Sequence, residues 1–344
     1  MRQAFGEVFE IRPGYLNTAS IGVPSVRMAQ TMIDTIADWR TGASEPAEFE
    51  PDVEAARAAW AHLVGVSPSD VAIGATASQL IGLVAASVPD GTRVLTVRNE
   101  FTSVTFPFAA QAHRGVMVTE VDAGQLTASV AATDLVAVSA VQSADGAVAE
   151  LAALRAAAAA VGARVVLDVT QAAGWMPLDL GWADYVVGTA YKWLLAPRGA
   201  SWLAVRADRL DELVPQGANW FAAEDIWKGI YGLPLRLAAS ARRLDLSPAW
   251  FSHRGAAASL PWIASLDMTA VRDHCVGLAN ATLTGLGLAP GNSAIIAIEL
   301  GEDQAARLAD AGVAASVRAG RVRLSYHLYN TVADVDLVLD ALQR

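Results

Sequence analysis

Lysine is scarce in this chain of 344 residues: only Lys192 and Lys228 among its 25 basic residues are lysines. A compositional bias toward arginine explains the scarcity by itself, and a solvated lysine is the usual state. An unprotonated lysine can nevertheless form a Schiff base with an aldehyde and transfer protons, whereas a guanidinium is a poor nucleophile. Lys192 lies in the apolar and aromatic stretch 191–195, so we take it as the candidate catalytic residue.

A carboxylate precedes this lysine at the end of another apolar run. Asp168 closes the run 164–169, and Gln171 follows it by one helical turn. A buried acid here can pair with the ring nitrogen of pyridoxal 5′-phosphate (PLP), whose aldehyde would bind the lysine. An aspartate at the end of a strand is also common as a turn or cap residue, and for Asp168 alone both interpretations stay open.

Small residues fill the loop between an expected strand, 71–74, and an expected helix, 78–88. Such a loop lets backbone N–H groups approach an anion at the helix N-terminus, and the hydroxyl groups of Thr76 and Ser78 add donors. Ordinary helix capping by these hydroxyls is the alternative. The motifs GxGxxG and GxxxxGK[ST] of nucleotide sites are absent, so the loop is a candidate phosphate site without a nucleotide fingerprint.

Apolar runs alternate with helical stretches over the first 250 residues. The expected strands are 71–74, 93–97, 116–121, 135–139, 164–169, 185–188 and 201–205. This alternation predicts an α/β fold with a mostly parallel sheet that is covered on both faces. Ligands bind at the carboxyl ends of such strands, which is where the candidate residues fall.

The pattern changes after about residue 249. A helical segment, 253–286, is followed by a strand, a helix, two short strands and a last helix, which predicts a compact α+β unit. We therefore expect a large domain over residues 15–250 and a smaller C-terminal domain over residues 251–344. Residues 1–14 are expected to pack with the smaller domain.

Composition narrows the possible partners. The net charge of −10 argues against a nucleic-acid or anionic-membrane partner, and no run of apolar residues is long enough to span a bilayer. The N-terminal residues do not resemble an export signal, so we expect a cytoplasmic protein. The single cysteine, Cys275, excludes an intrachain disulfide, and five scattered histidines predict no metal site.

These motifs resemble those of the class V aminotransferases, the fold-type-I PLP group that includes cysteine desulfurases, selenocysteine lyases and kynureninases. The resemblance runs from about Tyr15 to the C-terminus, and its most specific part is DxxQ followed by TAYKW. It implies a fold-type I PLP-dependent transferase fold with PLP as cofactor. It also implies that Lys192 carries the Schiff base, that Asp168 pairs with the pyridinium nitrogen and that Gln171 contacts the ring's phenolic oxygen.

The same resemblance assigns the other cofactor contacts. Thr76 and Ala77 correspond to the phosphate-binding turn, which Thr189 and Tyr191 would complete. In NEFTS, Phe101 corresponds to the aromatic residue that stacks on the pyridine ring. Desulfurases usually have histidine there and kynureninases have phenylalanine.

Three further positions complete the resemblance. Ser143 in AVQSADG stands where desulfurases usually have asparagine. The stretch LRLAASARRLDLSPAW resembles the segment that approaches the partner's active site, so Ser247 is expected to reach the phosphate across a homodimer interface and Arg243 to lie near the site. In RVRLSYHLYNT, Arg323 corresponds to the arginine that binds the substrate carboxylate, and we expect His327 to line the pocket.

The resemblance implies an amino-acid or amine substrate, and amino transfer is our first interpretation of the reaction. A carbon–sulfur lyase acting by β-elimination is the alternative. A persulfide-forming desulfurase is disfavoured, because the stretch 313–325 around Arg323 contains no cysteine and Cys275 lies in an expected helix as a buried thiol. An NAD-dependent oxidoreductase and an inactive binding homologue are more distant alternatives.

The sequence leaves one aromatic group open to two interpretations. Its members either line a substrate pocket or form the core of a subunit interface, where aromatic residues are enriched. They are Trp220, Phe221, Trp227, Tyr231 and Trp250.

Overall fold

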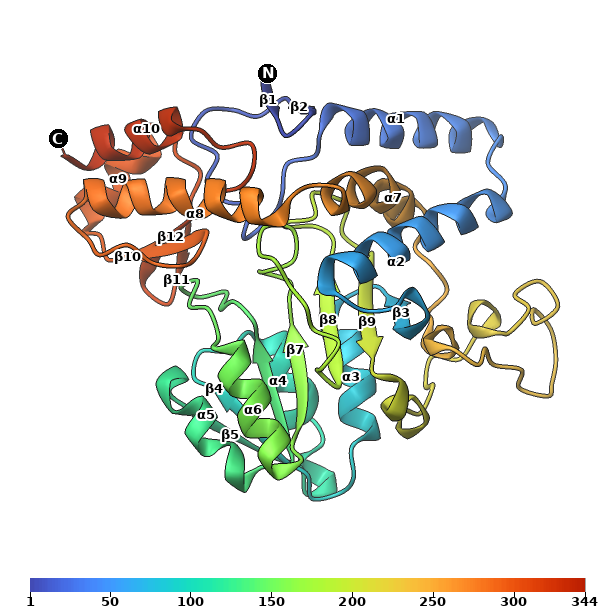
Figure 1. The fold of residues 1–344 in the computed structure, drawn as a ribbon. Helices are drawn as coiled ribbons and strands as arrows, with labels where there is room; N and C mark the ends of the chain where they lie inside the picture. Colours follow the sequence, from blue (N-terminus) through green and yellow to red (C-terminus); the bar gives the residue numbers. More distant parts are fainter. Residues whose placement is uncertain (344) are drawn as a thin grey trace.

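A seven-stranded sheet forms the centre of the computed structural model, which describes residues 1–343 (Figure 1). The strand order is β3-β9-β8-β7-β6-β4-β5. The strands are β3 (Val71–Gly74), β4 (Arg93–Val97), β5 (Met117–Val121), β6 (Leu135–Ser139), β7 (Arg164–Asp168), β8 (Tyr185–Thr189) and β9 (Ser201–Val205). Only β9 runs antiparallel to its neighbours, so the predicted, mostly parallel α/β sheet is confirmed.

Helices cover both faces of this sheet because its strands are apolar on both sides. In β6, Leu135 and Ala137 pack in one core with α3 (Ala77–Ser87) and α4 (Thr102–Ala109). The alternate residues of β6 join the other core, which α2 (Glu50–Val64), α6 (Leu151–Val161) and α7 (Trp250–Ala264) cover. This two-residue period is the geometry of an extended strand. Helix α1 (Val26–Thr41) packs on α7, and the short α5 (Leu126–Ser129) packs near α6.

The C-terminal part builds a second, smaller sheet. Its antiparallel strands β10 (Ile295–Ile298), β12 (Arg321–Ser325) and β11 (Ser316–Arg318) pair in that order. The helices α8 (Met268–Gly285), α9 (Glu302–Asp310) and α10 (Val332–Gln343) accompany this sheet. Apolar residues of these elements share a core of their own, as the sequence predicts for an α+β unit.

The N-terminal stretch contacts this C-terminal unit, as expected. It begins with a two-stranded antiparallel pair, β1 (Arg2–Ala4) and β2 (Glu7–Phe9). The guanidinium of Arg2 donates to the carboxylate of Asp334 (Nη2–Oδ1 2.8 Å), and the Gly14 N–H donates to the same oxygen at 2.8 Å. These contacts tie residues 1–14 to α10, while the exact limits of the two domains stay a prediction.

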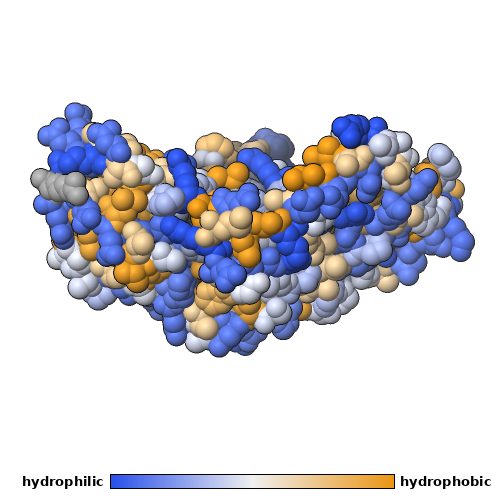
Figure 2. Space-filling model, turned by 90° about the horizontal axis from the view of Figure 1, so that it is seen from above, coloured by the Kyte–Doolittle hydropathy of each residue, from blue (hydrophilic) through white to orange (hydrophobic). Residues whose placement is uncertain are grey.

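Within residues 1–343, no helix combines the length and apolar character that a membrane crossing needs. Seen from above, apolar and hydrophilic side chains are interspersed over the surface, with the apolar ones in separate patches (Figure 2).

Candidate functional site

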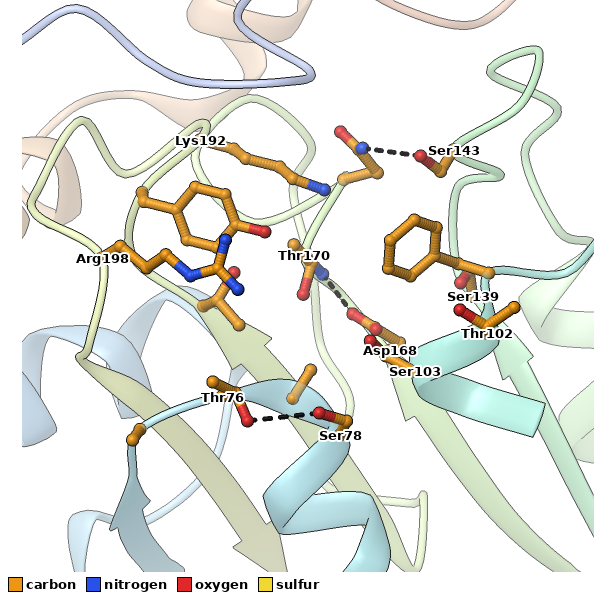
Figure 3. A pocket seen from close by; sticks show the side chains of 16 residues that line it. Thr76, Ser78, Thr102, Ser103, Ser139, Ser143, Asp168, Thr170, Lys192 and Arg198 are labelled. Atoms are coloured by element: carbon orange, nitrogen blue, oxygen red, sulfur yellow. Dashed lines mark hydrogen bonds between the residues drawn. The ribbon is translucent and has the colours of Figure 1, made fainter. Parts of the chain in front are cut away.

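A cavity of about 230 Å³ lies at the carboxyl edge of the large sheet. Residues that follow β3, β4, β6, β7 and β8 line it, as is usual for ligand sites of parallel sheets. Nine residues predicted from the sequence lie on its wall: Thr76, Ala77, Phe101, Ser143, Asp168, Gln171, Thr189, Tyr191 and Lys192. The amine of Lys192 reaches into this cavity between the labelled side chains (Figure 3).

Lys192 lies in the loop after β8 and is only 6% exposed. Its Nζ is 5.4 Å from the ring centroid of Phe101 and 5.6 Å from that of Tyr191. Burial lowers the pKa of the amine to about 8, although the nearby carboxylate of Asp168 opposes this shift. About a tenth of the Lys192 amine is therefore unprotonated at neutral pH, far more than in a solvated lysine, and only this form is a nucleophile.

Asp168 is the last residue of β7 and is almost fully buried. Its Oδ1 accepts a hydrogen bond from the Thr170 N–H at 2.7 Å. Burial raises the pKa of this carboxyl group above its ordinary value. A cation placed against it would lower the pKa again, so Asp168 suits a partner that carries a protonated ring nitrogen.

Phe101 presents its ring to the cavity at the start of α4, and a buried acid holds its backbone. The Glu100 carboxylate accepts from the Phe101 N–H at 2.8 Å and from the Ser139 hydroxyl at 2.6 Å. It also accepts from the Gln142 side-chain amide at 2.7 Å. These bonds join the end of β4 to the end of β6, so Glu100 positions both Phe101 and the loop that carries Ser143.

Gln171 is held on both sides of its amide group. Its Nε2 donates to the Ala19 carbonyl at 3.0 Å and to the Ser143 hydroxyl at 3.2 Å, and its Oε1 accepts from Trp193 Nε1 at 2.8 Å. Both N–H bonds of the amide are therefore engaged. To make the predicted contact with the phenolic oxygen of the ring, Gln171 would have to give up its hydrogen bond to Ala19 or to Ser143.

Arg323 lies in β12 behind Ser143 and is only 2% exposed. Its Nη1 donates to the Ser143 hydroxyl at 3.1 Å and its Nη2 to the Ser20 hydroxyl at 2.8 Å. Burial lowers the pKa of this guanidinium to about 10, and no carboxylate within residues 1–343 pairs with it. Arg323 does not itself line the cavity, but it contacts Ser143, which does.

The loop after β3 lies at one end of the cavity and is its candidate anion-binding end. Thr76 caps α3, with its Oγ1 accepting from the Gln79 N–H at 3.2 Å, so the capping interpretation also holds. A Cβ on Gly74 would lie 2.4 Å from Gln79 Oε1, so a side chain there would require Gln79 to shift. At the end of β8, the Thr189 hydroxyl is buried and has no hydrogen-bond partner within residues 1–343. It can therefore donate a hydrogen bond to an incoming anion.

Two predicted site residues lie away from this cavity in their own chain. Ser247 is exposed and accepts a hydrogen bond from Trp220 Nε1 at 3.2 Å, while Arg243 pairs with Asp211 (Nη1–Oδ1 2.7 Å). Neither lines the cavity, so their expected role across a homodimer interface stays a prediction.

The prediction for His327 was wrong. The ring is fully buried outside the cavity, with Nε2 2.9 Å from the Trp193 carbonyl oxygen. Burial lowers the pKa of His327 to about 3, so the ring stays neutral and supports the lysine loop from behind.

The group of aromatic residues also lies outside the cavity wall. Trp220 packs against Phe221 and Trp227, with ring centroids 5.4 and 5.6 Å away, and Trp250 stacks on Phe49. Tyr231 is 86% exposed. In a single chain, these rings therefore do not line the cavity that holds Lys192 and Asp168.

Sequence reasoning missed five residues on the cavity wall: Thr102, Ser103, Ser139, Thr170 and Arg198. Four of them lie at or just after the ends of β4, β6 and β7. The rule that ligands bind at the carboxyl ends of parallel strands could therefore have pointed to them. Arg198 lies in the loop before β9, where no motif pointed to it.

PLP fits these groups. Lys192 would hold its aldehyde, the carboxylate of Asp168 would face its ring nitrogen, and Phe101 would cover its ring. The N-terminus of α3 and the unpartnered Thr189 hydroxyl would face its phosphate. Within residues 1–343, no cluster of three histidine, cysteine or acidic side chains could hold a metal ion.

The chain is similar to several known proteins. It is 28% identical to the uncharacterized aminotransferase YcbU of Bacillus subtilis, over 94% of this chain and 91% of the relative. It is 30% identical to isopenicillin N epimerase of Streptomyces clavuligerus, over 60% of this chain and 56% of the relative.

Solved structures share the fold at lower identity. A cysteine desulfurase from Thermococcus onnurineus NA1 superposes with a TM-score of 0.83 at 20% identity, over 96% of this chain and 94% of the other. The cystine C–S lyase C-DES superposes with a TM-score of 0.84 at 19% identity, over 96% and 97% of the two chains. The family model described as aminotransferase class-V matches residues 37–296. The chain therefore belongs to the class-V aminotransferase family, which consists of PLP enzymes.

Proposed function

We propose that this protein is a PLP-dependent enzyme that labilises the Cα–H bond of an α-amino acid or related amine. The observation that carries the proposal is the pairing of a buried lysine of lowered pKa with a buried carboxylate in one cavity. When bound, PLP withdraws electrons from the Cα of an amine substrate.

Three side chains of the protein carry out the remaining steps. Lys192 takes the proton from Cα and returns it, because its amine is the titratable base on the cavity wall. Asp168 keeps the ring nitrogen protonated. Arg323 receives the substrate carboxylate, since its guanidinium has only neutral partners and suits bidentate binding. This assignment requires the Ser143 loop to admit the carboxylate.

Two reactions of the activated Cα are supported: amino transfer and β-elimination. Amino transfer remains our first candidate. The relative named an aminotransferase, which is matched over nearly the whole chain, favours it. β-Elimination at a carbon–sulfur bond is supported at least as strongly by the likeness in fold to a C–S lyase.

A persulfide mechanism is disfavoured by the position of the only cysteine. Cys275 is fully buried in α8, and burial raises the pKa of its thiol far above the ordinary range. A nucleophilic thiolate is therefore not available at the site.

The substrate is a small molecule, and a homodimer is the proposed assembly. The segment before Arg243 leaves large apolar side chains in solvent, notably Tyr231 (86% exposed), Leu233 (88%) and Leu235 (65%). Burial of such side chains against a second copy would also bring Ser247 toward the partner's site.

We expect the purified protein to be yellow and to take up PLP if it is not already loaded. Borohydride should then fix the chromophore to the peptide that holds Lys192, as mass spectrometry would show. Addition of single amino acids should change the visible spectrum. Build-up of the amine form of the cofactor would indicate amino transfer, whereas release of pyruvate, ammonia and a thiol would indicate elimination.

The same experiment separates this proposal from its rivals. A colourless protein that gains no absorbance from added PLP would contradict it and favour an oxidoreductase or an inactive binding homologue. Label on Lys228 alone would also contradict it. That lysine is exposed and pairs with Asp225 at 2.8 Å, so it serves as an internal control.

The rate at which cofactor-free protein captures PLP is expected to rise with pH, with its midpoint near pH 8, and to level off about one unit higher. Burial has lowered the pKa of Lys192 from 10.5 to about 8, and only the unprotonated amine attacks the aldehyde. Stopped-flow absorbance from about pH 6 to about pH 10 would follow this rise. A rate that keeps climbing to the top of that range would mean that the amine behaves as a solvated lysine.

A further inference from the structure

The anion-binding end of the cavity is built mainly from neutral donors. Thr76, Ser78 and Thr189 offer hydroxyl groups, and the N-terminus of α3 offers backbone N–H groups with a partial positive charge. A phosphate carries close to two negative charges, and removing such a group from water is costly unless a full charge compensates it. The neutral donors therefore leave part of that charge unmatched.

Arg198 is the cation at this end of the cavity. Its side chain lies on the same side as Thr76, opposite Thr102 and Ser143 (Figure 3). The guanidinium carbon lies 5.2 Å from the ring centroid of Tyr191, and this contact orients the side chain along the cavity wall.

No carboxylate within residues 1–343 pairs with Arg198, although many arginines of this acidic protein form ion pairs. The positive charge of Arg198 nevertheless acts on the site, because it is one of the charges that lower the pKa of Lys192. An unpaired guanidinium that faces a cavity is well placed to receive an anion.

The backbone around Arg198 is fixed, so the side chain starts from a defined position. The Arg198 carbonyl accepts a hydrogen bond from the Ser252 hydroxyl of α7 at 2.8 Å. Gly199 follows with a φ of +115°, and a Cβ there would lie 2.6 Å from the same hydroxyl oxygen. The loop approaches α7 as closely as only glycine permits.

We infer that Arg198 binds the phosphate group of the cofactor and supplies the positive charge that the threonine and serine hydroxyls cannot. The inference rests on the proposed function, since it concerns PLP. It assigns to this loop a binding role for a phosphate ester dianion, separate from the carboxylate-binding role proposed for Arg323.

The test compares two ligands that differ only in the phosphate group. Cofactor is removed from the holoenzyme with a carbonyl reagent, and absorbance titration gives dissociation constants for PLP and for pyridoxal. In Arg198→Met we expect the PLP constant to rise roughly 10- to 100-fold, the range for losing a charge-assisted hydrogen bond. The pyridoxal constant should stay unchanged, and Arg198→Lys should lie between wild type and Arg198→Met for PLP.

Arg155→Met is the matched control. Arg155 also lies over an aromatic ring, with its guanidinium carbon 6.0 Å from the centroid of Trp182, but it does not line the cavity. Its replacement should leave both constants unchanged. Circular dichroism would verify that each variant is folded.

Two results would overturn the inference. An equal loss of affinity for PLP and pyridoxal in Arg198→Met would mean that the residue acts through the ring or Lys192. Unchanged constants for both, with weaker binding of a dicarboxylic amino acid to the holoenzyme, would assign the charge to the substrate instead. A wild-type protein that binds neither ligand would refute the proposed function itself, which is a distinguishable result.

Discussion

Replacement of Lys192 by alanine is expected to reduce turnover of any productive amino acid by roughly 10²- to 10⁴-fold or more, because a positioned base is lost. The covalent attachment point for the cofactor is lost at the same time, so borohydride should no longer fix a chromophore. The measurement is kcat on the substrate found in the amino-acid panel, together with mass spectrometry after reduction. Lys192→Arg should be as inactive, since guanidinium remains charged near neutral pH.

The matched control for this prediction is the only other lysine. Lys228 has a side chain that is 87% exposed, and it lies outside the cavity wall, so Lys228→Ala should keep wild-type turnover. Retention of more than about a tenth of the turnover by Lys192→Ala would contradict the role of this amine as the base. Unchanged urea midpoints would show that the loss is chemical.

Replacement of Asp245 by alanine is expected to destabilise the fold by about 3–5 kcal/mol, because it leaves the buried guanidinium of Arg57 with only the half-exposed carboxylate of Glu54 (Nη2–Oε1 3.2 Å) as a counter-ion. Arg57 is 1% exposed and Asp245 is fully buried, and two hydrogen bonds join them (Nη2–Oδ2 2.8 Å, Nη1–Oδ1 3.1 Å). Asp245 also accepts from the Ile73 N–H at 2.8 Å, next to the phosphate loop. Urea unfolding followed by circular dichroism would measure the loss.

An exposed ion pair provides the contrast. Arg93 and Asp134 are joined at 2.7 Å, but their side chains are 51% and 46% exposed, so Asp134→Ala should cost at most about 1 kcal/mol. The double variant Arg57→Met/Asp245→Asn should recover much of the loss, because it removes the unpaired charge and keeps an acceptor for the Ile73 N–H. An Asp245→Ala loss no larger than the Asp134→Ala loss would contradict the prediction.

The candidate catalytic residues could be located from the sequence because each of them follows an apolar run within a short stretch of the chain. A lysine and an acid that each follow an apolar run must meet at the carboxyl edge of a parallel sheet. Lysine scarcity then singled out Lys192, and the cavity does bring it together with Asp168. The α+β character of the C-terminal part was predictable for the same local reason, since periodicity distinguishes strand from helix.

Residues that act through tertiary contacts were not predictable in this way. Arg198 belongs to the site because a hydroxyl of a distant helix holds its loop, and no local pattern encodes that contact. Gln171 was identified, but its amide is already engaged by three different loops, which spacing cannot reveal. His327 was misplaced because the turn after β12 carries it behind the lysine loop instead of into the cavity.

The contact between Arg2 and Asp334 has a consequence for how the chain is made. A ribosome extends a chain from its N-terminus, so Arg2 emerges long before the residue that neutralises it. Arg2 therefore stays without this counter-ion until α10 has been made, although β1 can already pair with β2. Closing so long a loop slows folding more than it weakens the final state, so docking of residues 1–14 on α10 should be among the late steps of folding.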